Sequence, residues 1–448
     1  MTIDRRALLL SGAFGAAALV RAGPLLAQAE GPPPILFVHG NGDHAALWQT
    51  TLWRFESNGY PADRLFAFNF TNPSARDDDS KPQDNRSSSD DAMRELAAQV
   101  EDVRKRTGAR KVALVGNSRG GNAIRNYVAQ EGAAANVSHV VLCGVPNHGI
   151  FDWDALTGSE FNSRGALLTR LNAQPDEITA GPAWLTLRSE ANDKYAQPDG
   201  RFVGKPGTPT NVTFAGPELK GAKNIVLGAL DHREVAFHPR AFAEMYRFIV
   251  GADPRSVITP QANVQLSGLV TGLAGTTPTN KPIAGAQVEA YATAPDTGAR
   301  VGEALWRGVT GASGAWGPVT APSSAPLEFV IAAQGHPTTH IYRSPFPRSS
   351  GVVHLRPARP LAAAEANIGA LVLFSRPRGY FGIGRDTIAF DGKEPADVKP
   401  GVPTDSVSTL RMSEFADRPI VAQFNEERIV SSPWPAKDNH QTVAELTY

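Results

Sequence analysis

The sequence has 448 residues, enough for two or three domains of ordinary size. Its 44 Lys and Arg balance 44 Asp and Glu, so the zero net charge disfavours a protein that binds nucleic acid through a field of one sign. Its 42 Gly and 35 Pro are too few for a disordered chain, and the single cysteine, Cys143, excludes an internal disulfide.

Residues 1–29 have the features of a cleavable export signal. Arg5 and Arg6 precede an apolar run at residues 7–20, which is too short to span a bilayer, and residues 27–29 read Ala-Gln-Ala. Paired arginines before a weakly hydrophobic segment resemble a twin-arginine signal, which exports folded proteins. We therefore expect a periplasmic or secreted protein with no transmembrane segment in its mature chain. An ordinary signal or a retained anchor is the alternative.

Residues 30–252 alternate short apolar runs with helical patterns. The runs are nearly continuous in hydrophobicity, as expected for strands that are buried on both faces of a parallel sheet. We predict such strands at residues 34–38, 65–70, 111–115, 139–143, 184–187 and 224–227. Helical spacing predicts helices at residues 93–103, 123–128 and 242–249. This βαβ pattern predicts an α/β fold with a doubly wound parallel sheet.

Turn residues at 253–262 indicate a linker, and helical periodicity is largely lost beyond it. Alternating runs at residues 264–270, 287–291, 306–309 and 327–331 predict a β-sandwich module over residues 263–358. Further runs at 370–374 and 419–424 indicate a second β-rich module at residues 359–448, or the completion of one β unit.

A G-x-S-x-G sequence, Gly116-Asn-Ser-Arg-Gly120, lies between a predicted strand and a predicted helix. This is the context of the nucleophile elbow, a tight strained turn that exposes a serine, so Ser118 is the candidate nucleophile. Side chains at positions 116 and 120 would collide with the neighbouring strand and helix. The alternative is a glycine-rich turn with a structural role only.

A serine hydroxyl needs a base, and hydrolases with such an elbow carry an acid and then a histidine downstream. His232 follows the last predicted strand and is the candidate base. His238 is its competitor, although a histidine before a helix start is commonly a cap.

The acid should lie in the loop after the strand at residues 184–187. Asp193 is our choice, with Glu190 and Asp199 as alternatives. Asp231 adjoins the candidate base, and we expect it to orient that loop.

The candidate oxyanion hole combines two loops. Residues 39–42, His-Gly-Asn-Gly, follow the first predicted strand, where such hydrolases carry their second oxyanion donor. The backbone N–H groups of Asn41 and Arg119 would stabilise the charged oxygen, and losing one such donor costs roughly 3–4 kcal/mol of barrier. Apart from a spaced pair, His336 and His340, the ten histidines show no ligand-like cluster, so we do not expect a catalytic metal.

From His39 to about Ile249 the sequence resembles the class 2 lipases of the α/β-hydrolase superfamily. The resemblance rests on His39-Gly40, residues 107–112, Ser118-Arg-Gly-Gly121, the Asp193 loop and Asp231-His232. It implies hydrolysis of carboxylic esters without a cofactor. Asn117 stands where the family usually has histidine, and Arg119 where methionine is commoner, which leaves the acyl preference open.

The β-sandwich module resembles carboxypeptidase-regulatory or transthyretin-like modules through its turns at Gly268, residues 282–286 and residues 310–316. The β-rich C-terminal half as a whole resembles that of certain two-domain prokaryotic lipases. We expect it to bind a lipid or polymer surface or to shape the acyl tunnel. The whole chain is then an exported serine lipase or esterase that acts on a small-molecule or lipid ester. An extracellular polyester depolymerase, a peptidase or amidase with the same triad, and a binding protein on an inactive hydrolase scaffold are the alternatives.

Two further segments bear on access to the site. Residues 71–91 form a polar loop that we interpret as a solvated rim rather than a calcium site. Residues 150–180 are expected to form either a small lid or an edge helix. His148, just before them, is interpreted as a structural loop residue.

Overall fold

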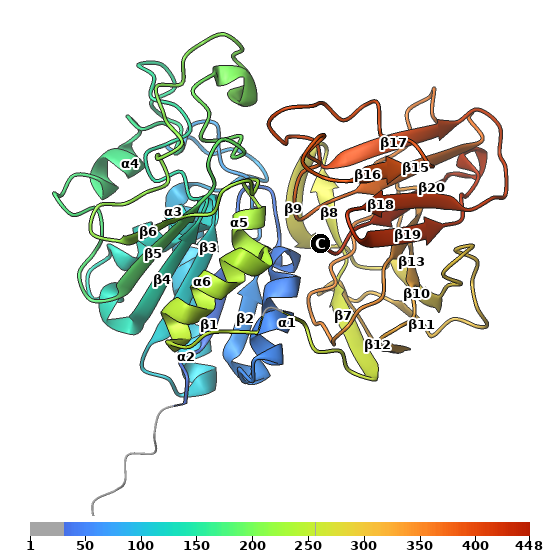
Figure 1. Ribbon diagram of the computed structural model, residues 1–448, viewed down its shortest axis with the longest axis horizontal. Coiled ribbons are helices and arrows are strands. Elements are labelled where there is room, and N and C mark those ends of the chain that lie inside the picture. The colour runs from blue at the N-terminus through green and yellow to red at the C-terminus, as the bar shows by residue number, and fades with distance from the viewer. Residues whose placement is uncertain (1–30, 256) are drawn as a thin grey trace, which may run out of the picture. The chain divides into compact units, whose positions relative to one another are not determined.

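The computed structural model describes residues 31–255 and 257–448, so the predicted export signal lies outside the described residues. Residues 32–448 form one compact unit. It contains a parallel sheet covered by helices and a second region built almost entirely of strands (Figure 1). Over the described ranges, no helix is both long enough and apolar enough to span a membrane.

The first sheet has six parallel strands in the order β2-β1-β3-β4-β5-β6. Its strands are β1 (Ile35–Val38), β2 (Leu65–Phe68), β3 (Val112–Asn117), β4 (Val137–Cys143), β5 (Ala183–Arg188) and β6 (Lys223–Val226). Each corresponds to one of the six predicted apolar runs. The predicted α/β-hydrolase fold class is confirmed.

Helices cover both faces of this sheet (Figure 1). They are α1 (Gln49–Ser57), α2 (Ser89–Thr107), α3 (Arg119–Val128), α4 (Ala166–Leu171), α5 (Glu234–Phe237) and α6 (Pro239–Val250), with 3-10 turns η1 (Ala45–Trp48), η2 (Ala62–Arg64), η3 (Ala133–Asn136), η4 (Gly200–Val203) and η5 (Ala436–Asp438). Successive strand residues point to opposite faces, which gives two cores. Phe37 packs with the core that contains α1 and α6, and Leu36 with the core that contains α2 and α3.

The second region is organised around a seven-stranded sheet in the order β11-β10-β13-β14-β20-β15-β17. Smaller sheets pair β7 with β12, β8 with β9, and β16, β18 and β19 with one another. The strands are β7 (Asn263–Leu269), β8 (Thr271–Ala274), β9 (Thr277–Pro282), β10 (Gln287–Ala292), β11 (Trp306–Val309), β12 (Ala315–Pro322), β13 (Leu327–Ala332), β14 (Thr338–Arg343), β15 (Ala370–Ser375), β16 (Ile388–Phe390), β17 (Val407–Met412), β18 (Ile420–Phe424), β19 (Glu427–Ser431) and β20 (His440–Glu445).

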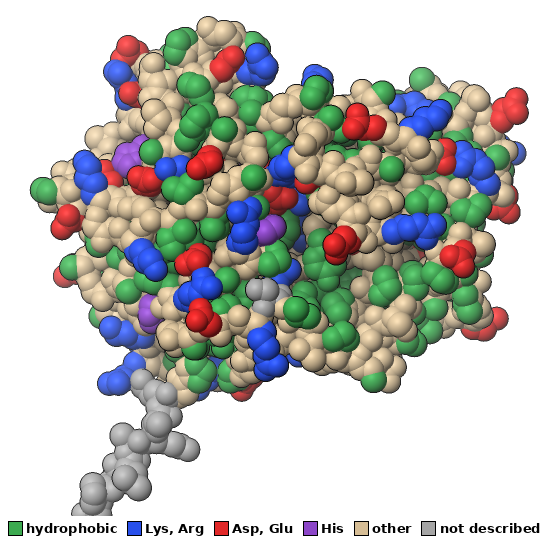
Figure 2. Space-filling model, viewed as in Figure 1, with side chains coloured by type: hydrophobic (Ala, Val, Ile, Leu, Met, Phe, Trp, Pro, Cys, Tyr) green, Lys and Arg blue, Asp and Glu red, His purple; other side chains and the backbone are tan. Residues whose placement is uncertain are grey.

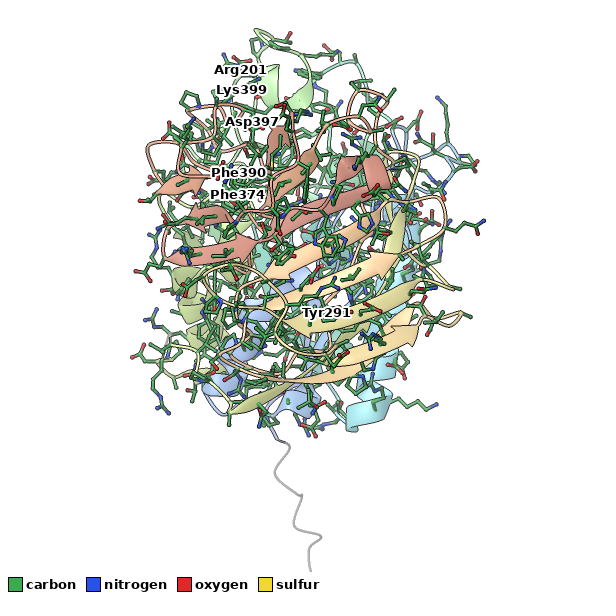
Figure 3. All side chains as sticks on the ribbon, turned by 90° about the vertical axis from the view of Figure 1, so that its right-hand side faces the viewer. Arg201, Tyr291, Phe374, Phe390, Asp397 and Lys399 are labelled. Carbon is green, nitrogen blue, oxygen red and sulfur yellow. The ribbon has the colours of Figure 1, made fainter. Side chains whose placement is uncertain are left out.

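Strands from residues 263–358 and from residues 359–448 share that seven-stranded sheet. β20 pairs in parallel with β14 on one side and with β15 on the other. The domain boundaries expected from the sequence stay predictions. One core of this region contains Phe374 and Phe390, whose ring centroids are 5.4 Å apart (Figure 3). On the surface, acidic and basic side chains alternate over the face shown in Figure 2, in keeping with the zero net charge.

Trp53 of α1 belongs to the core of the β-rich region. Its side chain is 1% exposed and packs with the buried side chains of that region. The Phe346 ring lies edge-on at a centroid distance of 6.0 Å, and the indole Nε1–H donates to the carbonyl of Ser349 at 2.9 Å. A helix of the α/β part therefore completes a core of the β part.

We predict that Trp53→Ala lowers the free energy of unfolding by about 3–5 kcal/mol, because it empties a buried aromatic site and removes a hydrogen bond. Denaturant unfolding followed by circular dichroism measures the change. Val257→Ala, at a position that is 77% exposed, is the control and should change it by less than about 0.5 kcal/mol. A loss below about 1 kcal/mol in Trp53→Ala would contradict the shared core.

Candidate active site

Ser118 lies in a strained turn between β3, which ends at Asn117, and α3, which begins at Arg119. Its φ of 53° and ψ of −129° lie in a region that non-glycine residues rarely occupy. A Cβ atom on Gly120 would lie 2.4 Å from the carbonyl oxygen of His39, and one on Gly116 would lie 2.6 Å from Ile124 Cδ1. The chain can pass this turn because both positions lack a side chain.

Asp193 and His232 form a buried pair beside this turn. The Nδ1 atom of His232 lies 2.9 Å and 3.0 Å from the two carboxylate oxygens of Asp193, and both side chains are at most 3% exposed. With its proton on Nδ1, the imidazole donates a hydrogen bond to the carboxylate, and Nε2 is left as the hydrogen-bond acceptor. The Tyr195 ring packs edge-on against the imidazole at a centroid distance of 4.7 Å.

The alternative candidates for the acid and for the base make their contacts elsewhere. Glu190 is exposed, and Asp199 caps η4, where backbone N–H groups of Arg201 and Gly207 lower its pKa. His238 caps α6 by accepting from the backbone N–H of Arg240 at 3.2 Å, and burial lowers its pKa to about 4. None of these contacts involves the Asp193–His232 pair.

The candidate oxyanion loops meet at the turn. Gly40 lies against Ser118, since a Cβ atom on Gly40 would come within 2.9 Å of the serine Cβ. The Asn41 side chain accepts from the backbone N–H of Ala75 at 2.7 Å, which fixes its loop. Arg119 is the first residue of α3, where backbone N–H groups have no partner within the helix. The assignment of Asn41 and Arg119 as oxyanion donors stays a prediction.

Asn117 and Arg119, the two departures from the family pattern, have structural contacts that the sequence did not predict. The Asn117 amide donates to the carbonyls of Cys143 and His232 at 2.9 and 3.2 Å, and so ties the histidine loop to the end of β3. The Arg119 guanidinium is buried and forms an ion pair with Glu160. It also donates to the carbonyl and hydroxyl of Ser87.

Through Arg119 the polar loop 71–91 and the segment 150–180 are both held to the elbow helix. His148, before that segment, contacts Glu177 at 2.9 Å and the carbonyl of Gly216 at 2.8 Å. In the part of the chain that the structure describes, no group of three or more His, Cys, Asp and Glu side chains is placed to hold a metal ion. Whether the segment 150–180 moves as a lid stays a prediction.

The loop that carries His232 is held by the β-rich region. Asp231 is fully buried, accepts from the backbone N–H of Tyr380 at 2.8 Å and pairs with Arg376 at 3.0 Å. Glu234, in the first turn of α5, pairs with Arg376 at 2.6 Å and with Arg385 at 2.7 Å. Burial raises the pKa of Asp231, while the two arginines favour its charged form. Asp231 also accepts from the backbone N–H groups of Arg233 and Glu234, and it links the His232 loop to residues 376–385.

A cavity of about 100 Å³ opens on the candidate residues. Its lining includes Ser118, His232, Asn41 and the apolar side chains of Pro146, Ile150 and Phe161. Its polar lining includes Asp43, Tyr195, Arg233 and, from the β-rich region, Tyr380. The cavity therefore brings Ser118, His232 and Asn41 together with Tyr380, which lies 148 positions after His232 in the sequence.

His39 supports the floor of the site. Its Nδ1 atom lies 2.9 Å from the carbonyl of Gly40, and its Nε2 atom accepts from the backbone N–H of Phe70 at 3.1 Å. Burial lowers its pKa to about 4, so the ring is neutral at pH 7. Both nitrogens are used in holding the loop that precedes Asn41.

Two family models match the chain. Residues 32–145 match the class 2 lipases, and residues 262–360 match the lipase C-terminal domain. These matches confirm the predicted resemblance and the enzyme class that it implies, the carboxylic ester hydrolases. A search of curated proteins found no match.

Solved structures similar to the chain include two of a Bacillus licheniformis lipase. The mature form is 20% identical with a TM-score of 0.35 and covers 49% of this chain and 92% of its own. The propeptide form is 14% identical with a TM-score of 0.36 and covers 89% and 96%. A Paleococcus ferrophilus monoacylglycerol lipase is 14% identical with a TM-score of 0.34, covering 49% and 96%.

We predict that Arg376→Ala lowers the free energy of unfolding by about 3 kcal/mol or more, because it leaves Asp231 and Glu234 short of a partner in a buried place. It should also lower kcat/KM for esters, since the His232 loop loses its support. Urea unfolding and ester hydrolysis measure both effects. Arg418→Ala, which removes a partly exposed pair with Asp391, is the control and should cost less than about 1 kcal/mol. Equal losses in the two variants would contradict the role of Arg376.

His39 should make the protein sensitive to acid. Because its pKa is about 4 in the folded state and about 6.5 when unfolded, only the unfolded chain takes up this proton between those values. Its contribution to stability is complete above pH 6.5 and falls by up to about 1.4 kcal/mol per pH unit down to pH 4. We measure the free energy of unfolding from pH 4 to 8 for the wild-type protein and for His39→Gln. Below pH 6.5 it should fall less steeply with decreasing pH in the variant, and above pH 6.5 the two curves should be parallel. Curves that stay parallel between pH 4 and pH 6.5 as well would refute this prediction.

Proposed function

We propose that this carboxylic ester hydrolase is a serine lipase or esterase in which Ser118 is the nucleophile, His232 the base and Asp193 the acid that orients it. The observation that carries the proposal is the arrangement of the site: a buried Asp193–His232 pair and the strained Ser118 turn border one cavity. This arrangement fits the triad logic, in which a base beside the nucleophile is itself oriented by a third group.

The proposed reaction follows from the hydrogen-bonding capacity of these groups. Ser118 Oγ attacks the ester carbonyl carbon while His232 Nε2 takes the hydroxyl proton, and Asp193 stabilises the imidazolium that forms. Backbone N–H groups of Asn41 and Arg119 stabilise the oxyanion. The imidazolium then gives its proton to the departing alcohol, which leaves an acyl ester on Ser118. Water hydrolyses that ester with His232 again as base, and the carboxylic acid is released.

The size of the cavity bears on the acyl group. A volume of about 100 Å³ with Pro146, Ile150 and Phe161 in its lining accommodates a short apolar acyl chain. A long chain would need the segment 150–180 to move. The proposal therefore includes a preference for short acyl esters.

We also propose that the protein is exported, to the periplasm or the medium, on the features of residues 1–29. For the β-rich region we propose a part in building the site, supported by the contacts of Arg376 and Tyr380. Binding of a lipid or polymer surface by the same region remains a proposal from the sequence alone.

We predict that Ser118→Ala lowers hydrolysis of p-nitrophenyl butyrate by at least about a thousandfold, because no oxygen nucleophile remains in the elbow. A fluorophosphonate probe should label the wild-type protein and fail to label this variant. His238→Ala, which alters the competing histidine, should retain most of the activity. Activity that survives in Ser118→Ala, or is lost in His238→Ala and kept in His232→Ala, would refute the assignment.

A further inference from the structure

A second cavity borders the loop that carries His232. Its volume is about 920 Å³. Leu230 and Glu234, which precede and follow His232 by two residues, belong to its lining, whereas His232 and Arg233 line the catalytic cavity. None of the described residues lines both cavities. The second cavity is therefore a binding site to be considered separately from the catalytic one.

Arg54 of α1 brings a buried cation without a carboxylate partner to this second cavity. The residue is 4% exposed and belongs to the cavity lining. Its Nη1 atom donates to the carbonyl of Phe237 at 2.9 Å. Among the described residues, no acidic side chain pairs with Arg54, and Nη2 has no hydrogen-bond partner. The Nε atom is also unpaired, but it is closed off from solvent, so Nη2 is the nitrogen that a ligand can reach.

The charge of Arg54 persists although its burial is unfavourable. Burial lowers the pKa of Arg54 to about 10, so the guanidinium is still protonated at pH 7. A buried cation without an anion beside it costs free energy. Such a group at the wall of a cavity indicates that its partner comes from outside the chain.

The acidic side chains of the second cavity have other partners. Glu234 and Asp386 form ion pairs with Arg376 and Arg385. Glu427 accepts hydrogen bonds from one hydroxyl and two backbone N–H groups. The remaining acidic residue of the lining, at position 426, is exposed. An anionic ligand is thus the partner that Arg54 lacks.

Tyr448 adds a second donor to the same cavity. Its phenol O–H has no hydrogen-bond partner among the described residues, and the phenol is close enough to Arg54 to affect the pKa of that guanidinium. Burial raises the pKa of the phenol, so it keeps its proton at pH 7. Apolar side chains also line the cavity, namely Leu230, Phe237, Pro345 and Phe424. A ligand that matches this lining has one anionic oxygen group and an apolar body.

We propose that the second cavity binds a carboxylic acid with an apolar body, whose ionised carboxylate accepts hydrogen bonds from Arg54 Nη2 and the Tyr448 O–H. Carboxylic acids are also what a carboxylic ester hydrolase releases, so the ligand class includes products of this enzyme class. The inference does not depend on the assignment of Ser118 as nucleophile. Glu234 and Arg376 line the cavity as well, so a bound acid lies beside the residues that hold the His232 loop.

The test measures binding of octanoate to the intact protein by isothermal titration calorimetry. We expect one octanoate per chain with a Kd below about 1 mM. Octanamide has the same apolar chain without the charge, and we expect it to bind at least about 10-fold more weakly, because it lacks the charge-assisted hydrogen bond to Arg54. Inorganic phosphate is anionic without the apolar body and should also bind at least about 10-fold more weakly than octanoate.

Two Arg-to-Gln variants distinguish the two cavities. Arg54→Gln removes the charge from the second cavity and should weaken octanoate binding by about 10- to 100-fold. Arg233→Gln makes the same change in the lining of the catalytic cavity and should leave the Kd within about twofold. Tyr448→Phe removes only the phenol oxygen and should raise the Kd by about 3- to 10-fold. It tests the site independently if Arg54→Gln does not fold, which circular dichroism checks.

Three results would overturn the proposal. The first is a wild-type protein that binds octanoate no better than octanamide or phosphate. The second is octanoate binding that neither Arg54→Gln nor Tyr448→Phe weakens. The third is binding that is lost in Arg233→Gln and kept in Arg54→Gln, which would place the carboxylate in the catalytic cavity. A protein that gives any of these results and still hydrolyses p-nitrophenyl butyrate disproves this site alone and leaves the proposed function standing.

Discussion

The geometry of the candidate active site depends on the buried ionic contacts between the His232 loop and residues 376–385. Asp231 and Glu234 face Arg376 and Arg385, and of these four side chains only Arg385, at 18%, is more than slightly exposed. Burying charged groups is costly, and the cost is offset only while every partner keeps its position. The network is therefore a poor source of net stability and a strong constraint on geometry. It fixes the loop between β6 and α5, whose histidine, His232, pairs with Asp193.

The β-rich region thus helps to build the candidate active site. It contributes Tyr380 to the cavity wall, the Asn280 amide to the backbone of the candidate oxyanion loop, and Arg376 to the His232 loop. In return α1 inserts Trp53 into its core. Each half thus supplies partners to buried polar or aromatic groups of the other. Such reciprocal dependence makes independent motion of the two halves costly.

The sequence predicted the parallel sheet and the elbow well because both are local patterns. Six apolar runs, and a serine between a strand and a helix, can be recognised within a few residues. Strands such as β14 and β20 were not predicted, because polar residues such as His340 and Gln441 are buried there among partners from distant strands. The contacts of Arg119, Asp43 and Arg376 were missed for the same reason, since each partner lies more than 30 residues away or in the other half.

The position of β20 has a consequence for the order in which the molecule assembles. This strand fills the middle of the seven-stranded sheet, between β14 and β15, although about 95 residues separate it from β14 along the chain. Pairings between such distant segments form slowly, because loop closure must precede the contacts that stabilise it. Arg378, beside Arg376, donates to the carbonyls of Leu446 and Thr447, just beyond β20. During synthesis, the contacts of Arg378 with Leu446 and Thr447 can therefore form only after β20 has left the ribosome, later than every strand of the parallel sheet.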